Sequence, residues 1–176
     1  MTTRGRCAPS WGWARPHAHL MITSPAGDEG MEYMAQLHMV ADRLGVDLRY
    51  AADRFAHRRY HHGPKRIYAL SDAYLEADMI TFPSLYEGFG NALVESVYFG
   101  KPLLVNRYSV YESDIRPLGF RFIEIEGVIT DETVEQVLAL LADPERIAED
   151  ARHNFALGQL HLSYEMLESR LRDLVG

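Results

Sequence analysis

Hydrophobic and polar positions alternate with two different periods along this chain, which predicts an α/β fold. Residues 19–23 (HLMIT) form a short, mostly apolar run that is typical of a buried strand. Apolar residues then recur at helical spacing up to Leu44, and Gly45 is well placed to end that helix. The following residues, 46–50, alternate as a strand does. The chain therefore begins strand, helix, strand, the order typical of a parallel α/β layer.

A polar connection is expected over residues 51–66. It holds five arginine or lysine residues and three histidines, but no Cys or carboxylate partners at metal-ligand spacing, so a metal site is not predicted there. We interpret the segment as a solvated loop; contact with a phosphorylated acceptor or an anionic surface is the alternative. Its basic and imidazole residues are Arg54, His57, Arg58, Arg59, His61, His62, Lys65 and Arg66.

A second group of strands and helices follows this connection. Residues 67–70 indicate a short edge strand, and a helix is expected from Ser71, its N-cap, to about Ala77. Residues 79–82 are apolar or β-branched throughout, which is typical of a strand buried on both faces.

The next predicted helix spans 91–99, and two residues that follow it are suited to end a helix. Gly100 is suited to the position after the last turn, and Pro102 prevents the helix from continuing. Strands are then expected at 103–105 and 121–124.

The last part of the chain has helical periodicity. One helix is expected from Thr130, a second after the Asp143-Pro144 pair, and a third from Ser163. The third helix carries an apolar stripe that we expect to pack on the parent domain. The stripe consists of Tyr164, Leu167, Leu171 and Leu174.

Composition limits the class of protein. The 176 residues are 47% hydrophobic, enough for one domain with a core, and the formal charge of −7 argues against broad nucleic-acid binding. No apolar run approaches the roughly 18 residues of a membrane span, so no integral membrane segment is expected. Cys7 is the single cysteine, which makes a reducing, cytoplasmic location the natural expectation.

The N-terminal residues 1–18 differ from the rest of the chain. They contain arginines, two tryptophans and prolines but no acidic residue, and no continuous apolar segment follows the arginines as in a secretory signal. We interpret them as an atypical, disordered leader. Residues 19–176 are then expected to form one Rossmann-like α/β domain with a parallel sheet, flanking helices and a helical C-terminal tail.

The segment 78–106 carries the candidate chemistry. It is predicted to form a strand, a glycine-bearing loop, a helix and a strand within the length of one βαβ unit, which places the loop at the carboxyl edge of the sheet. The glycines let the backbone approach a ligand, and the unpaired amides that open the helix suit a diphosphate. The segment lacks the third glycine of the dinucleotide fingerprint and the lysine-hydroxyl pair of a P-loop.

Two glutamates flank this loop. Glu95 lies one turn into the predicted helix, ~6 Å along its axis from Asn91, where its carboxylate can accept hydrogen bonds from the vicinal hydroxyls of a ribose. Glu87 lies before the glycines, where a sugar attached to the diphosphate would be. Together they predict a nucleotide-sugar site.

Pro83-Ser84, followed by Glu87-Gly-Phe-Gly-Asn-Ala-Leu-Val-Glu95 and Gly100-Lys-Pro102, resembles the glutamate–seven residues–glutamate signature of the GT-B retaining glycosyltransferases, family 4 in particular. The resemblance extends over about residues 20–174 and is most specific in 78–105. It implies the C-terminal, donor-binding half of the GT-B fold.

The resemblance also implies roles for individual residues. Glu87 would be the catalytic-site carboxylate that faces the anomeric centre of the donor sugar, and Glu95 would bind the ribose. The enzyme would need no metal and no cofactor, because the helix and basic side chains offset the charge of the leaving diphosphate. The amides expected to hold the sugar and the diphosphate are those of Gly88, Phe89, Gly90, Asn91, Ala92 and Leu93.

Two departures from the family shape the functional hypotheses. The family's Gly-Arg…Lys-Gly segment, whose cations grip the diphosphate, has no equivalent here, and the acceptor-binding N-terminal domain is expected to be missing from a truncated product or supplied in trans. The first hypothesis is therefore the donor-binding half of a transferase. The alternatives are a non-catalytic nucleotide-sugar-binding remnant or subunit and, ranked last, a GT-B relative such as an epimerase.

Overall fold

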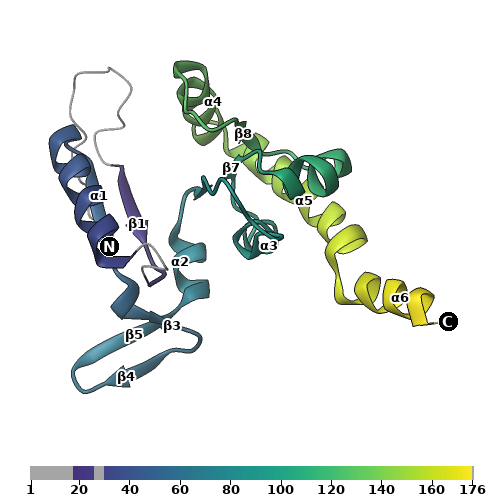
Figure 1. Cartoon of the computed structure of the whole chain (residues 1–176), viewed down its shortest axis with the longest axis horizontal. Coiled ribbons are helices and arrows are strands. Elements are labelled where there is room, and N and C mark those ends of the chain that lie inside the picture. Colours follow the sequence, from purple (N-terminus) through teal and green to yellow (C-terminus); the bar gives the residue numbers. More distant parts are fainter. Residues whose placement is uncertain (1–17, 26–29, 176) are drawn as a thin grey trace. The chain divides into compact units, whose positions relative to one another are not determined.

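The computed structural model describes residues 18–25 and 30–175, and it divides the chain into two compact units, Met1–Ala73 and Tyr74–Gly176 (Figure 1). The leader predicted at residues 1–18 lies outside the described residues except for its last position.

The described part of the first unit opens with the expected strand, helix and strand. Strand β1 (His19–Ile22) pairs in parallel with β2 (Asp47–Tyr50), and helix α1 (Gly30–Leu44) connects them. Gly45 adopts a positive φ of 66° directly after the helix, as predicted. The predicted burial of β1 is wrong, since Leu20 is 43% exposed; β2 is the single strand beside β1 among the residues described.

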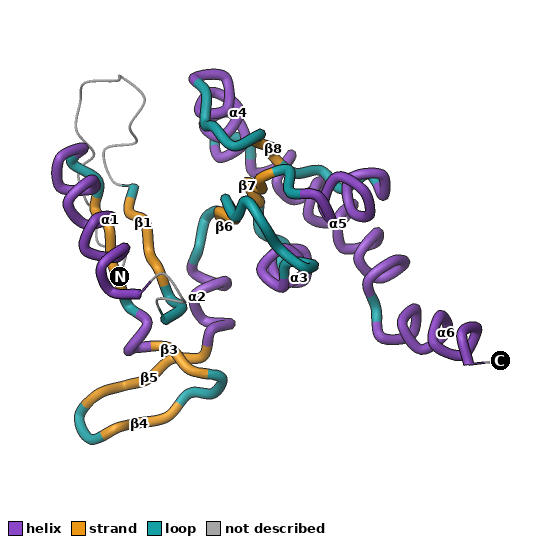
Figure 2. Tube along the Cα trace, in the orientation of Figure 1, coloured by secondary structure: helices purple, strands orange, loops and turns teal. Residues whose placement is uncertain are grey.

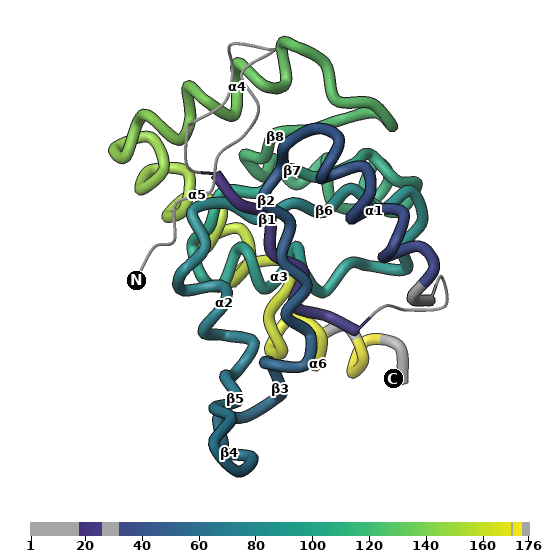
Figure 3. Tube along the Cα trace, turned by 90° about the vertical axis from the view of Figure 1, so that its left-hand side faces the viewer, coloured from purple at the N-terminus to yellow at the C-terminus, as the bar shows by residue number. Residues whose placement is uncertain are grey.

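The connection at 51–66 is mostly solvent-exposed, as expected, but it contains strands and a turn where a loop was predicted. A short 3₁₀ turn η2 (Ala52–Arg54) leads into β3 (Phe55–Ala56), β4 (Tyr60–His62) and β5 (Lys65–Ala69). Strand β5 is central in the order β3-β5-β4, parallel to β3 and antiparallel to β4, so it is not the predicted edge strand. The β4–β5 hairpin projects from the rest of this unit (Figure 3).

Local contacts explain why this polar segment is ordered. Gly63 occupies the first position of the two-residue turn between β4 and β5 and has a φ of 58°. Tight hairpin turns need a positive φ at this position, which glycine adopts readily. Two of the basic residues form ion pairs inside the unit. These pairs are Arg59 with Asp72 and Lys65 with Asp53.

The second unit is built on a parallel sheet of β6 (Ile80–Phe82), β7 (Leu103–Asn106) and β8 (Ile123–Ile125), in the order β6-β7-β8 (Figure 2). Helix α2 (Leu70–Glu76) runs across the boundary between the two units. Helix α3 (Asn91–Tyr98) connects β6 to β7, which confirms the predicted βαβ arrangement. All four residues of β7 are buried, as expected of a central strand.

The connection from β7 to β8 supplies much of the core. It contains a π-helical turn η3 (Tyr111–Ile115) and a 3₁₀ turn η4 (Arg116–Leu118), neither of which the sequence pattern predicts. Tyr111 and Ile115 are fully buried against Leu93 of α3 and its neighbours.

The strand predicted at 121–124 begins two residues later, at Ile123. The backbone of Arg121 is paired with a side chain rather than with a strand: its N–H donates to Asn154 Oδ1 (2.8 Å), and its carbonyl accepts from Asn154 Nδ2 (3.0 Å). The strand is therefore shorter than predicted, because Asn154 of a helix makes the hydrogen bonds that a neighbouring strand would otherwise make with Arg121.

Three helices complete the unit: α4 (Asp131–Leu141), α5 (Pro144–Leu162) and α6 (Tyr164–Val175). Thr130 and Asp143 cap the first two with their side chains, as predicted. Helix α5 packs closely on α3, because a Cβ on Gly158 would lie 2.9 Å from Val97.

The prediction that the α6 stripe packs on its domain is wrong for the side chains described. Tyr164 is 87% exposed, Leu167 53% and Leu171 51%. Ser163 between α5 and α6 is extended, with a ψ of 161°, and α6 continues past the end of α5, away from the sheet of its unit (Figure 1).

Candidate functional site

The loop 83–90 follows β6 at the carboxyl edge of the sheet and leads directly into α3. Glu87 is half-buried in this loop, while Gly88 and Phe89 are exposed. Every residue of the predicted donor site thus belongs to one continuous loop–helix segment of the second unit, with Glu87 before the glycines and Glu95 on the helix.

Gly90 ends the loop in a left-handed conformation, with φ 95° and ψ 79°. A Cβ built on it would lie 2.7 Å from Cε1 of Phe82 and 2.7 Å from the hydroxyl of Tyr108. Gly90 is therefore required both by its backbone dihedrals and by the rings packed against it. Gly88 differs, because a Cβ there would have nothing within 4 Å.

The N-terminus of α3 keeps part of its hydrogen-bonding capacity. Gly90 is the N-cap and provides no side chain, so α3 lacks the side-chain cap that Thr130 gives α4. The N–H of Leu93 already donates to the carbonyl of Gly90 (3.0 Å). An anion approaching this end would therefore meet the positive pole of the helix and the amides that precede Leu93.

Tyr108 fixes the position of the loop through a hydrogen bond and a ring contact. Its hydroxyl donates to the carbonyl of Phe89 (2.6 Å), and its ring makes an edge-to-face contact with Phe82. Burial, and secondarily the negative charge of Glu87, raise the pKa of the Tyr108 hydroxyl, so it stays a proton donor. The backbone of the glycine loop is thus fixed by a buried side chain.

Asn106, the last residue of β7, joins the loops that follow three adjacent strands. Its Nδ2 donates to the carbonyl of Ser84 after β6 (3.1 Å), and its Oδ1 accepts from the N–H of Gly127 after β8 (2.7 Å). The side chain is 3% exposed. Asn106 is therefore a structural organiser of this edge that the sequence analysis did not identify; a polar residue ending a fully apolar strand was the available signal.

Glu95, on the second turn of α3, has a partner that the sequence did not reveal. The hydroxyl of Tyr74, a residue of α2, donates to Glu95 Oε2 (2.6 Å). The Tyr74 ring stacks on Phe99, with centroids 5.1 Å apart and planes at 13°. Burial first, and then the hydrogen bond to Glu95, raise the pKa of Tyr74, which keeps it protonated.

Lys101, in the Gly-Lys-Pro part of the motif, has a structural contact. Its ammonium donates to the carbonyl of Leu75 near the end of α2 (2.9 Å), where a cation complements the helix dipole. Gly100 before it has the positive φ of 62° expected after a helix.

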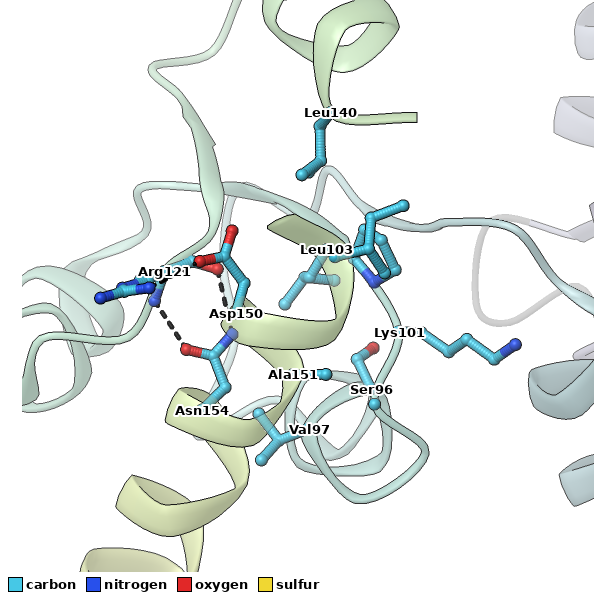
Figure 4. A pocket seen from close by; sticks show the side chains of 12 residues that line it. Ser96, Val97, Lys101, Leu103, Arg121, Leu140, Asp150, Ala151 and Asn154 are labelled. Carbon is cyan, nitrogen blue, oxygen red and sulfur yellow. Dashed lines mark hydrogen bonds and ion pairs between the residues drawn. The ribbon is translucent and has the colours of Figure 1, made fainter. Parts of the chain in front are cut away.

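A small cavity of about 20 Å³ lies between α3, β7 and α5 (Figure 4). Arg121, Asp150 and Asn154 are joined by hydrogen bonds and an ion pair on one side of it, while Lys101 points away. Neither Glu87 nor Glu95 lines this cavity, so it is separate from the candidate donor site, and it has room for about one water.

Among residues 18–25 and 30–175, no three His, Cys, Asp or Glu side chains are grouped so that they could hold a metal ion. Within the same ranges, the helices are all too short or too polar to cross a membrane.

Comparison with known proteins adds a family assignment to this geometry. The sequence pattern of the family described as Glycosyl transferases group 1 matches residues 58–156, which include the loop and α3. The chain is 31% identical over 156 residues to the mannosylglucosylglycerate synthase of Thermotoga maritima and 30% identical over 154 residues to that of Petrotoga mobilis. The alignments cover 81% and 80% of this chain but 35% of each synthase, so the chain spans about a third of their length.

Solved structures show the same fold. Anabaena HepE in complex with UDP superimposes with a TM-score of 0.68 at 15% identity, over 98% of this chain and 47% of HepE. The C-terminal domain of the group 1 glycosyl transferase LpcC from Francisella tularensis gives 0.62 at 12% identity, over 85% of this chain and 72% of that domain. The predicted match to the C-terminal half of the GT-B fold is confirmed.

Proposed function

Because this chain belongs to the group 1 glycosyl transferases, we propose that its second unit binds the nucleotide diphosphate sugar donor of a retaining sugar transfer. One observation carries the proposal. A left-handed glycine, Gly90, opens α3 at the carboxyl edge of a parallel sheet, with one glutamate before it in the loop and another on the helix. This is where open α/β sheets bind ligands.

In this proposal the diphosphate lies at the N-terminus of α3. The amides from Gly88 to Ala92 and the helix dipole offset its two negative charges without a metal ion. When the bond from the anomeric carbon to the diphosphate oxygen breaks, its electron pair stays on the diphosphate, and this charge is stabilised by the same amides. The acceptor oxygen forms the new bond on the same face, and its proton passes to the departing diphosphate.

The two glutamates have different proposed tasks. Glu87 lies at the sugar side of the glycines, where its carboxylate stabilises the positive charge that develops at the anomeric centre. Glu95 accepts hydrogen bonds from the ribose hydroxyls. Support comes from their placement on either side of the uncapped helix end, and from the half-burial of both side chains.

The relatives suggest which ligands to test first. HepE has been crystallised with UDP and with UDP-glucose, which supports a uridine diphosphate sugar among the candidate donors. The two curated relatives are named for mannosylglucosylglycerate synthesis, so formation of that product is the first transfer reaction to assay. Since the chain spans a third of those proteins, we further propose that transfer requires an acceptor-binding N-terminal domain, in the same protein or in trans.

Calorimetric titration of the full 176-residue chain tests the donor site. UDP, GDP, ADP and their sugar conjugates are the probes, and at least one is expected to bind and to raise the melting temperature. Glu95→Ala should weaken binding of the nucleoside diphosphate, whereas Glu87→Gln should leave it nearly unchanged. A chain that binds none of these nucleotides at millimolar concentration would refute the proposal, and loss of nucleoside diphosphate affinity in Glu87→Gln would remove Glu87 from the sugar side.

A further inference from the structure

We propose that Tyr74 is a positioning residue, which holds the Glu95 carboxylate so that its second oxygen, Oε1, receives the ribose of the donor. The inference rests on the proposed donor site and deepens it. The pattern of the sequence gave no indication of this pair, since the two residues are 21 positions apart and lie on different helices.

Tyr74 is well fixed before any ligand arrives. It is 8% exposed, and its ring stacks on Phe99, which makes an edge-to-face contact with Tyr98. The next residue along α2, Leu75, is held by its carbonyl to the ammonium of Lys101. The hydroxyl of Tyr74 therefore occupies a defined position, and the hydrogen bond that it donates can select one rotamer of Glu95.

The geometry leaves half of the Glu95 carboxylate available. Tyr74 donates to Oε2 at 2.6 Å, and within the described part of the chain no hydrogen bond is made to Oε1. A carboxylate has about four acceptor sites on its two oxygens, so Oε1 can still accept from a pair of vicinal hydroxyls. A glutamate that is already ordered loses less rotamer freedom on binding than a freely rotating one, which favours affinity.

Charge supports the same arrangement. Burial and the neighbouring carboxylate raise the pKa of Tyr74, so the phenol remains a neutral donor and Glu95 remains the acceptor. If Tyr74 served only to anchor α2 on α3, its ring would be sufficient and the hydroxyl would have no influence on how the ribose binds.

The test separates these two roles by removing the hydroxyl while keeping the ring. Wild-type chain and Tyr74→Phe are titrated by calorimetry with UDP, GDP and ADP, each paired with its 2′,3′-dideoxy counterpart. Positioning predicts that Tyr74→Phe weakens binding of the normal nucleotide roughly five-fold, the effect of about one hydrogen bond, and changes binding of the dideoxy nucleotide less than about two-fold. A purely structural role would weaken both ligands equally.

Two further variants make the result decisive. Glu95→Ala and the double variant Tyr74→Phe/Glu95→Ala should bind the nucleotide equally, because Tyr74 acts through the Glu95 side chain, which both variants lack. Phe99→Leu, which loosens the ring but keeps the hydroxyl, should give a smaller loss with the same dependence on the ribose hydroxyls; it is also the test if Tyr74→Phe does not fold.

The outcomes for the inference and for the proposed function are distinct. Equal loss for normal and dideoxy nucleotides, or unchanged binding of both, would overturn the role of Tyr74 while leaving the donor site in place. Failure of the wild-type chain to bind any of the three nucleotides would overturn the donor site itself, and Tyr74 with it.

Discussion

Replacing Gly90 by alanine is the sharpest structural test of the loop that carries the proposed donor site. Two costs follow from the structure around Gly90. The left-handed dihedrals of φ 95° and ψ 79° are unfavourable for an L residue by about 1–2 kcal/mol. The new Cβ would also lie 2.7 Å from both Phe82 Cε1 and the hydroxyl of Tyr108.

The second cost is large because the rings have little room to move. Tyr108 is 2% exposed and donates to Phe89, and Phe82 lies edge-on against it. Overpacking of this kind costs about 1–3 kcal/mol. The sum is a destabilisation of about 2–5 kcal/mol, which lowers Tm by roughly 4–20 °C in a chain of this size.

Thermal and urea unfolding followed by far-ultraviolet circular dichroism would measure this change, with Gly88→Ala as the matched control. A Cβ at Gly88 meets nothing within 4 Å, so that variant should unfold within about 0.5 kcal/mol of wild type. If Gly90→Ala were as stable as Gly88→Ala, the described conformation of the loop would be wrong. Gly90→Ala should also lose affinity for the donor nucleotide, because relief of the clash displaces the amides that open α3.

Three further changes should have equally specific effects. Asn106→Leu leaves the carbonyl of Ser84 and the amide of Gly127 without their partner, and urea unfolding should show a loss of about 1–3 kcal/mol. Gly158→Ala places a Cβ 2.9 Å from a side-chain carbon of Val97, an overpacking that costs about 1–3 kcal/mol, while alanine gains about 1 kcal/mol of helix propensity inside α5. Urea unfolding should therefore show a net loss of up to about 2 kcal/mol, and a gain of about 1 kcal/mol would contradict that packing. The pKa of Glu112 is lowered chiefly by its hydrogen bond to Arg107. The Glu112 carboxylate therefore stabilises the fold above pH 4.5, and this stabilisation is lost as the pH falls through the lowered pKa. In Glu112→Gln this part of the acid unfolding curve should be absent.

The parts of the fold that follow local rules were predictable. The βαβ segment around the candidate site was identified because an apolar strand, two glycines and a Gly-Lys-Pro helix end each have a local physical meaning. The hairpin of β4 and β5 was missed, because a ribbon with exposed polar side chains has no hydrophobic period. Its register depends on the turn at Gly63, which was the remaining local signal.

The contacts that organise the candidate site were not predictable, for a different reason. Glu87 and Glu95 were found by their spacing, but Tyr74, Tyr108 and Asn106 act on residues 19 to 22 positions away. Such contacts depend on how α2 and the sheet place the backbone, and residue type alone does not encode them. The exposed stripe of α6 was mispredicted for a related reason. An apolar helix face indicates that the face is buried against something, but it does not indicate which surface covers it.

The most direct test of the donor site is the response of individual backbone amides to a nucleoside diphosphate. Heteronuclear NMR spectra of the full chain would be recorded during titration with UDP, GDP and ADP. For the nucleotide that binds, we expect the largest saturable changes of amide chemical shift at Gly88–Ala92 and at position 95. In Glu95→Ala the change at position 95 should be lost. Saturable binding whose shifts lie elsewhere, with the amides at the start of α3 unaffected, would contradict the account.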